Sequence, residues 1–193
     1  MLRLKFLVTL ALWAGAMSVS HAQGIPNPDQ VPLQLDTEMD DIEALPENFQ
    51  RQPVFYRTHE PAGTIIIDTT ERYLYLIKGS NVAIRYGIGV GRDGFAWKGL
   101  QKVSRKAEWP DWTPPAEMIE RQPYLPRWMA GGPGNPMGAR ALYLGATIYR
   151  IHGTNQPETI GHAVSSGCFR LVNDDVAHLY DQVAVGARVI IMK

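Results

Sequence analysis

The sequence contains a single cysteine, Cys168, among 193 residues. One thiol cannot close a disulfide within the chain, and it cannot form a Cys-x-x-Cys redox pair or a multi-cysteine zinc site. A metal site made of His152, His162 and Cys168 stays open, although no His-x-x-x-His spacing supports it. In an exported protein, a lone thiol is intermolecular, inert and buried, or reactive.

The chain also has no formal net charge, because 19 Lys and Arg residues balance 19 Asp and Glu residues. A chain of this kind has no basic footprint for nucleic acid, and we expect no nucleic-acid partner. Its length is enough for one self-sufficient hydrophobic core, since a domain of about 150 residues buries roughly 68–70% of its unfolded surface.

Long apolar runs are absent, and the run at residues 6–19 is shorter than the roughly 20 residues that a membrane helix needs. It follows Arg3 and Lys5 and precedes Ser20-His-Ala-Gln23, which is the three-part pattern of a secretory signal. We therefore predict a signal peptide at residues 1–22 rather than a membrane anchor. After cleavage the chain is expected to be exported, with no transmembrane span and no cysteine at the cut to accept a lipid.

Residues 23–52 are rich in proline and acidic residues and poor in apolar periodicity. Such a composition cannot bury enough apolar surface to offset chain entropy, so we predict an extended or loosely docked N-terminal segment. Residues 53–193 are predicted to form the folded domain, because Pro53-Val-Phe-Tyr56 is apolar enough to lie against it.

The pattern after Gly63 indicates strands. The predicted strands are short, rich in β-branched and aromatic residues, and separated by turn residues: 64–68, 73–78, 82–86, 100–108, two strands within 141–151 around Gly145, and 187–192. One helix is predicted near residues 174–182, with Asn173 as its N-cap. The class is mostly β, a sandwich or rolled sheet with one or two short helices, and a proline- and glycine-rich loop at residues 113–138 is of the length usually associated with function or disorder.

The candidate catalytic residues lie in two short stretches of the sequence, one around His152 and one around Cys168. A thiol is a strong nucleophile only as a thiolate, and a histidine is the usual base for it. His152 ends one predicted strand and Cys168 begins another, so neighbouring strands would bring the two side chains together. Taken alone, each residue also fits an inert structural role.

Further candidate residues flank this pair. Gly167 removes a side chain where a substrate backbone approaches, and the amides of residues 166–168 point to an oxyanion site that includes Ser166. Arg170 shares a strand face with Cys168 and could bind a carboxylate. Its structural alternative is pairing with Asp174 or Asp175 or with carbonyls of the loop. The glycines of residues 87–91 are followed by further glycines rather than a helix, so they indicate a bent strand rather than a phosphate loop.

These motifs together resemble the L,D-transpeptidase catalytic domain, the YkuD or ErfK-YbiS-like family. The resemblance is carried by His152-Gly153 and by Ser165-Ser-Gly-Cys-Phe-Arg170, and it extends over about residues 50–193. Many family members have a histidine directly before the Gly-Cys pair, where this chain has Ser166. The general base of the family maps onto His152, and Gly153 joins the expected substrate-binding residues.

The resemblance implies a β-sandwich-like rolled mixed sheet and a cell-wall reaction in the periplasm. Cys168 would attack the diaminopimelate–D-Ala bond of a peptidoglycan tetrapeptide stem and form a thioester. The stem would then pass to a neighbouring diaminopimelate or to an amine of an outer-membrane protein or lipoprotein, whereas water as acceptor would make the enzyme an L,D-carboxypeptidase. A catalytically idle peptidoglycan-binding module and a redox protein are the alternatives, and no cofactor or metal is expected.

Overall fold

The computed structural model describes residues 45–193. The predicted signal peptide at residues 1–22 and residues 23–44 of the predicted N-terminal segment lie outside the described residues. Within residues 45–193, no helix has the length and apolar character needed to cross a membrane.

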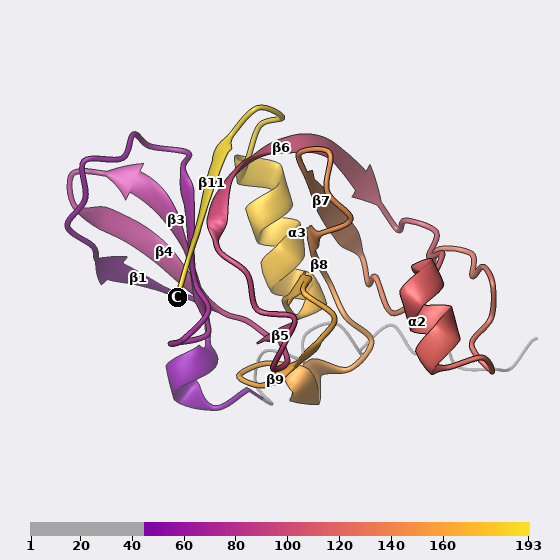
Figure 1. The fold of residues 1–193 in the computed structure, drawn as a ribbon. Coiled ribbons are helices and arrows are strands. Elements are labelled where there is room, and N and C mark those ends of the chain that lie inside the picture. The colour runs from indigo at the N-terminus through magenta and orange to yellow at the C-terminus, as the bar shows by residue number, and fades with distance from the viewer. Residues whose placement is uncertain (1–44) are drawn as a thin grey trace, which may run out of the picture. The chain divides into compact units, whose positions relative to one another are not determined.

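A mixed sheet of nine strands dominates the fold, and it confirms the mostly β class (Figure 1). Most neighbouring strands are antiparallel, but β11 runs parallel to β2 and β10 runs parallel to β8. In sheet order the strands are β1 (Gln52–Phe55), β4 (Val82–Gly87), β3 (Tyr73–Gly79), β2 (Ile65–Asp68), β11 (Arg188–Met192), β6 (Gly99–Glu108), β7 (Arg140–Leu144), β8 (Arg150–His152) and β10 (Phe169–Arg170). A separate parallel pair joins β5 (Val90–Gly91) to β9 (Ala163–Ser165).

Local sequence explains the hairpins that build the first half of the sheet. Asp68 caps the turn after β2, where its Oδ1 accepts hydrogen bonds from the amides of Thr70 and Glu71, both at 2.9 Å. Ser80 and Asn81 have positive φ angles of 53° and 59° between β3 and β4, as a tight hairpin turn requires. The strands predicted at residues 64–68, 73–78 and 82–86 are therefore confirmed.

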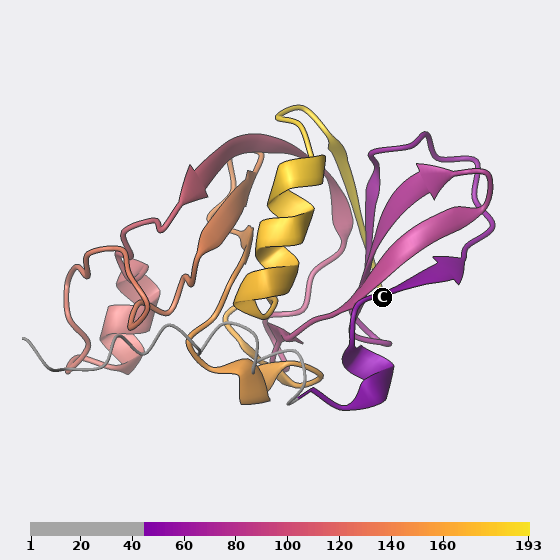
Figure 2. The same ribbon diagram turned by 180° about the vertical axis from the view of Figure 1, so that it is seen from behind.

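The long strand β6 joins the two halves of the sheet. Residues 99–102 of β6 pair with β11, and residues 103–108 pair with β7, with a register irregularity between Val103 and Arg105. Helix α3 (Asn173–Gln182) packs against β7 and lies between the two halves, as the view from behind shows (Figure 2). One core of buried side chains draws on both halves and on the helix, including Ile65, Leu142 and Leu179. The two-strand prediction for residues 141–151 is confirmed, with the turn at Gly145.

The start of α3 differs from the prediction. Val172 occupies the N-cap position and no side chain caps the helix, so the assignment of Asn173 as N-cap is wrong. The reason is a competing tertiary contact, because Asn173 Oδ1 accepts a hydrogen bond from the amide of Ala139 at 2.8 Å.

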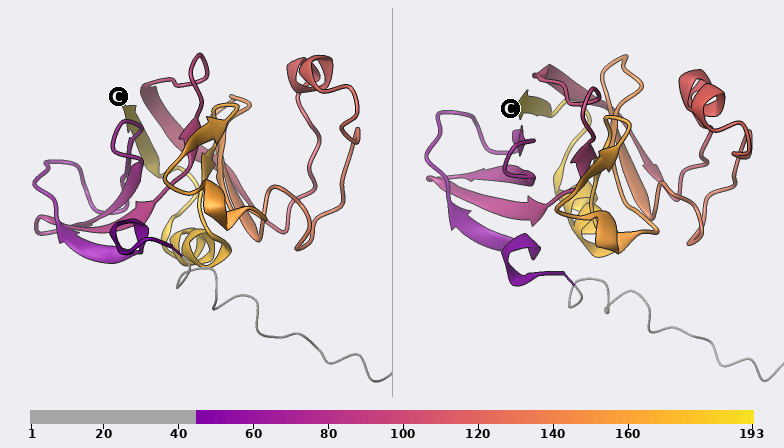
Figure 3. Two further views of the ribbon diagram at one scale, coloured as in Figure 1. Left: turned by 90° about the horizontal axis from the view of Figure 1, so that it is seen from below. Right: turned by 60° about the horizontal axis from the view of Figure 1, so that its bottom comes forward.

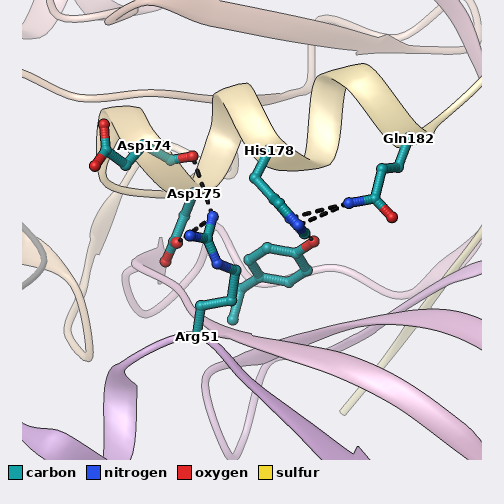
Figure 4. A network of polar contacts seen from close by, with 6 residues as sticks. Arg51, Asp174, Asp175, His178 and Gln182 are labelled. Carbon is teal, nitrogen blue, oxygen red and sulfur yellow. Dashed lines mark hydrogen bonds and ion pairs between the residues drawn. The ribbon is translucent and has the colours of Figure 1, made fainter.

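Residues 45–51, from the predicted N-terminal segment, lie against the sheet and α3. The short 3-10 helix η2 (Glu47–Phe49) places Phe49 in a small cluster with Leu45, Ile160 and Val172. Arg51 then reaches α3, where its Nη1 lies 3.3 Å from Asp175 Oδ1 and donates to the Asp174 carbonyl at 3.4 Å (Figure 4).

The proline- and glycine-rich segment carries a second helix, α2 (Ala116–Arg121), at the far side of β7 from α3 (Figures 1 and 3). Two backbone hydrogen bonds between Trp112 and Met129, at 2.8 and 2.9 Å, join the chain before α2 to the chain after it. A third bond runs from the Gly131 amide to Asp111 Oδ1 at 2.9 Å. The loop predicted at residues 113–138 is thus an ordered excursion from the sheet that holds the short helix α2.

Candidate active site

The parallel pairing of β8 with β10 is what brings the predicted catalytic residues together. Phe169 pairs with Ile151 and Arg170 pairs with His152. Ile151 and Phe169 point into the core, where both are buried. Alternation along the strands therefore turns Arg150, His152, Cys168 and Arg170 to the opposite face.

That face forms one wall of a cavity of about 410 Å³. His152, Cys168, Ser166 and Arg170 all line it. The facing wall comes from the 113–138 segment, through the residues Pro115, Met118, Arg121, Gln122, Leu125, Pro136 and Met137. The excursion that carries α2 therefore completes the cavity that His152 and Cys168 both line.

His152 is buried and held in one tautomer. Its Nδ1 lies 2.5 Å from the carbonyl oxygen of Gly153, and a carbonyl can only accept, so Nδ1 carries the proton and Nε2 is the free basic nitrogen. Burial, as the largest cause, and the charges of Arg170 and Arg150 together lower the pKa of His152 from 6.5 to about 3, although the hydrogen bonds to the carbonyls of Gly153 and Met137 act in the opposite direction. The imidazole is therefore neutral at neutral pH, which is the form that a general base needs.

A tight turn presents Cys168 to the cavity. Ser165 Oγ donates to the Cys168 carbonyl at 2.6 Å and accepts from the Gly167 amide at 3.1 Å. Gly167 has φ of +106°, and a Cβ there would lie 2.4 Å from Cε1 of Tyr149. Only glycine fits this position, and the group that excludes a side chain is the Tyr149 ring.

Aromatic packing supports the same turn. Trp97 stacks on Tyr149 with ring centroids 4.6 Å apart, and its Nε1 donates to the Gly167 carbonyl at 2.9 Å. Gly91 lies on the other side of the turn, where an added Cβ would be 3.2 Å from Gly167 Cα. The glycines of residues 87–91 thus allow close backbone approach, as the bent-strand interpretation requires.

Burial favours the protonated form of the Cys168 thiol. Desolvation raises its pKa, whereas the backbone amide and guanidinium of Arg150 and the charge of Arg170 lower it. Together with the lowered pKa of His152, this favours a neutral thiol–imidazole pair over a thiolate–imidazolium pair.

Positive charge dominates the cavity. Arg92, Arg121, Arg150 and Arg170 line it, and none of the described residues lining it is an aspartate or glutamate. Among residues 45–193, none of these four arginines forms an ion pair. Among the described residues, the guanidinium of Arg170 has only long hydrogen bonds, at 3.4 Å to Gln156 Oε1 and 3.5 Å to Thr159 Oγ1, and burial lowers its pKa. A cavity of this kind is suited to a ligand that carries carboxylates.

Three other residues considered in the sequence analysis, Gly153, Asp175 and His162, do not line the cavity. Gly153 is not part of the cavity lining; it orients His152 through its carbonyl, and a Cβ there would meet Asn173 Oδ1. Asp175 pairs with Arg51 rather than with Arg170. His162 is exposed, and no cluster of three or more potential metal ligands exists among the described residues.

Sequence reasoning missed several residues of the site. Arg150 stands two positions before His152 in β8, so strand alternation could have placed it on the catalytic face. Trp97, Tyr149 and Arg121 carried no such signal, because they reach the site through long-range packing.

Comparison with known proteins defines the class. The family model for the L,D-transpeptidase catalytic domain, YkuD, matches residues 62–191, and the chain belongs to this family. The probable L,D-transpeptidase YbiS of Escherichia coli (strain K12) is 44% identical over 135 residues, covering 65% of this chain and 43% of that protein. The chain thus matches less than half the length of this curated relative.

Solved structures agree on the fold. An L,D-transpeptidase from Mycobacterium smegmatis has a TM-score of 0.55 at 19% identity and covers 67% of this chain and 58% of that one. A crystal structure from Brucella melitensis, described as a probable carnitine operon oxidoreductase, is 45% identical with a TM-score of 0.52, covering 79% of this chain and 99% of that one.

Proposed function

We propose that the chain is an exported peptidoglycan L,D-transpeptidase that uses Cys168 as nucleophile and His152 as general base. The observation that carries this proposal is the placement of both side chains on one wall of a cationic cavity, with His152 Nε2 left free by the Nδ1 contact to Gly153. Family membership supplies the reaction class.

In the first half-reaction, His152 Nε2 accepts the proton of the Cys168 thiol while the sulfur attacks the carbonyl carbon of the diaminopimelate–D-Ala bond. The C–N bond breaks, and the imidazolium returns the proton to the departing amine. The products are free D-Ala and a stem held as a thioester. Because the Gly167 amide already donates to Ser165 Oγ, the amides of Ser166 and Cys168 are the proposed donors to the oxyanion.

In the second half-reaction, an acceptor amine attacks the thioester carbon and gives its proton to His152. The C–S bond breaks, and the imidazolium returns that proton to the departing Cys168 sulfur. A neighbouring diaminopimelate would give a crosslink, and an amine of an outer-membrane protein or lipoprotein would give an attached protein. Water would give the L,D-carboxypeptidase reaction.

The charge of the cavity supports this substrate class. A tetrapeptide stem ends in the carboxylate of D-Ala and carries another carboxylate on diaminopimelate, and the four arginines of the lining have no acidic partner among the described residues. We assign Arg170 to the donor stem because it pairs with His152 across β10 and β8 and lines the cavity beside it. Charge-assisted hydrogen bonds of this kind are worth about 1.5–3 kcal/mol.

The proposed location follows from the substrate. Peptidoglycan lies outside the cytoplasmic membrane, so the proposal needs the signal peptide at residues 1–22 and places the mature protein in the periplasm. The proposed catalytic domain is residues 53–193, and residues 23–52 precede it in the mature protein.

Intact-protein mass spectrometry tests the proposal. After incubation with a disaccharide-tetrapeptide, the proposal expects a mass increase equal to the substrate minus D-Ala, and the adduct maps to Cys168. Cys168→Ala should show no adduct. An unmodified wild-type protein that still binds substrate would identify an idle wall-binding module, and a sulfenate or mixed disulfide as the only change would identify redox chemistry. Repeating the experiment with each candidate amine reveals the acceptor.

A further inference from the structure

The structure leaves the chemical role of one cavity residue unassigned. Arg150 is the first residue of β8, and it stands at the same level of the sheet as Cys168, one step before the pairs Ile151–Phe169 and His152–Arg170. Both Arg150 and Cys168 line the cavity. Within residues 45–193 the guanidinium forms no ion pair, and its buried Nε has no hydrogen-bond partner.

A purely structural role would need a partner that holds the guanidinium away from the sulfur. Among the described residues, the guanidinium of Arg150 has a cation–π contact with the Tyr143 ring, whose centroid lies 5.1 Å from Arg150 Cζ. Arg105 contacts the same ring more closely, with its Cζ 3.6 Å from the centroid. The contact of Arg150 with Tyr143 is therefore the weaker of two, and it leaves the charge directed at the cavity.

We propose that Arg150 is a further catalytic residue, whose guanidinium stabilises the Cys168 sulfur as it becomes an anion. The proposal deepens the proposed transpeptidase function and rests on it for its role in turnover. It divides the two arginines of this wall between the two reacting side chains, with Arg150 level with the thiol and Arg170 level with the imidazole.

The chemical need for such a residue follows from the electrostatics of the site. Burial acts against the charged form of both Cys168 and His152, so proton transfer from sulfur to Nε2 creates two charges in a desolvated place. A cation beside the sulfur lowers the free energy of the thiolate, and it does so most effectively where water is excluded. The same charge would disfavour the imidazolium, and its position next to the sulfur rather than the imidazole makes the net effect favourable.

The single cysteine of the chain allows a direct test. Iodoacetamide alkylation, measured as a function of pH, reports only on the Cys168 thiolate. Arg150→Gln removes the guanidinium but keeps the backbone amide of residue 150, which also contacts the sulfur. We expect the midpoint of alkylation to rise by about one pH unit or more, which is a tenfold slower reaction at a fixed pH below the midpoint.

The matched control is Arg105→Gln, because Arg105 has the same charge, contacts the same Tyr143 ring and is exposed outside the cavity. Its alkylation profile should coincide with that of the wild type. Arg150→Lys keeps a positive charge and should give an intermediate profile. Arg150→Met keeps an apolar stem of similar length and provides the neutral variant if the glutamine variant does not fold.

The outcomes separate this proposal from the proposed function. A neutral Arg150 variant that is folded by circular dichroism and has the wild-type alkylation profile would overturn the role of Arg150, even if thioester formation is intact. A raised midpoint together with no thioester in the wild-type protein would support the contact with the thiolate and would reject the transpeptidase function instead.

Discussion

Arg170 lies directly across from His152 in the parallel pairing of β10 with β8. The backbone of Arg170 is fixed on its other side by two hydrogen bonds to Gly89, both at 2.9 Å. A rigid backbone therefore holds a cation next to a buried imidazole, and this charge is the largest cause after burial of the lowered pKa of His152. A carboxylate bound to Arg170 would offset the charge of its guanidinium and would therefore raise the pKa of His152.

Replacing each of the two histidines, His152 and His162, with alanine tests which of them is the general base. His152→Ala should slow thioester formation by on the order of 10²–10⁴-fold, the usual contribution of a general base. His162→Ala is the matched control and should have little effect, because His162 is exposed and lies outside the cavity lining. Single-turnover mass spectrometry measures both rates. Dispensable His152 with essential His162 would contradict the assignment.

The pH dependence of the wild-type rate provides a second view of His152. Only the neutral imidazole accepts a proton, so activity is lost as the pH falls through the pKa of the folded state. That pKa is lowered from 6.5 to about 3, and the acidic limb of kcat/KM due to His152 should therefore lie far below 6.5. A limb near 6.5 that disappears in His152→Gln would show that the imidazole is solvated in the working enzyme.

Arg170→Gln tests the proposed carboxylate contact. Loss of a charge-assisted hydrogen bond should raise KM by roughly tenfold or more. The melting temperature should change little, because Arg170 forms no ion pair within the described residues and its side-chain contacts are 3.4 Å or longer. Steady-state kinetics and a thermal melt decide the matter, and a large loss of stability with unchanged KM would assign Arg170 a structural role.

Gly167→Ala should disrupt the turn that carries Cys168. The variant combines the strain of a left-handed φ of +106° with a clash against the Tyr149 ring, so we expect a large loss of activity and a lower melting temperature. Gly186→Ala is the matched control, since its φ is +93° but no atom lies within 4 Å of the added Cβ. It should show a modest stability loss and near-normal activity. Equal activity in the two variants would indicate that the turn geometry is not required.

Asp175→Asn should change how stability depends on pH. Burial raises the pKa of Asp175 to about 6 from 3.8, so between these values the folded state binds a proton that the unfolded state has released. The wild type therefore loses stability as the pH rises through this window, by on the order of 2–3 kcal/mol, and the asparagine variant avoids that loss. Denaturant titrations at pH 3.5 and pH 7 should show the variant gaining relative to the wild type at the higher pH. A stability difference between the variant and the wild type that is the same at both pH values would contradict this assignment.

Local patterns determined much of the architecture. Runs such as Ile65–Asp68 and Tyr73–Gly79 read as strands because their β-branched and aromatic residues favour extended backbone, and turn residues between them set the hairpins. The motif in which His152-Gly153 precedes Ser165-Ser-Gly-Cys168 could also be identified from the sequence, because it does not depend on which strands become neighbours. Family membership therefore follows from the sequence, and so does the prediction of Cys168 and His152 as the two central site residues.

Long-range contacts decided the rest. Asn173 looked like a helix cap because N-cap preference is a local rule, but the Ala139 amide took its oxygen. Gly153 looked like a substrate contact, whereas in the folded chain its carbonyl fixes the tautomer of His152. The place of Arg150 next to Cys168 depends on the register of β8 against β10, and the wall formed by α2 depends on the path of a proline-rich excursion. Strand register and the docking of such a segment are set by packing between residues far apart in the chain, and that information appears only when the whole core assembles.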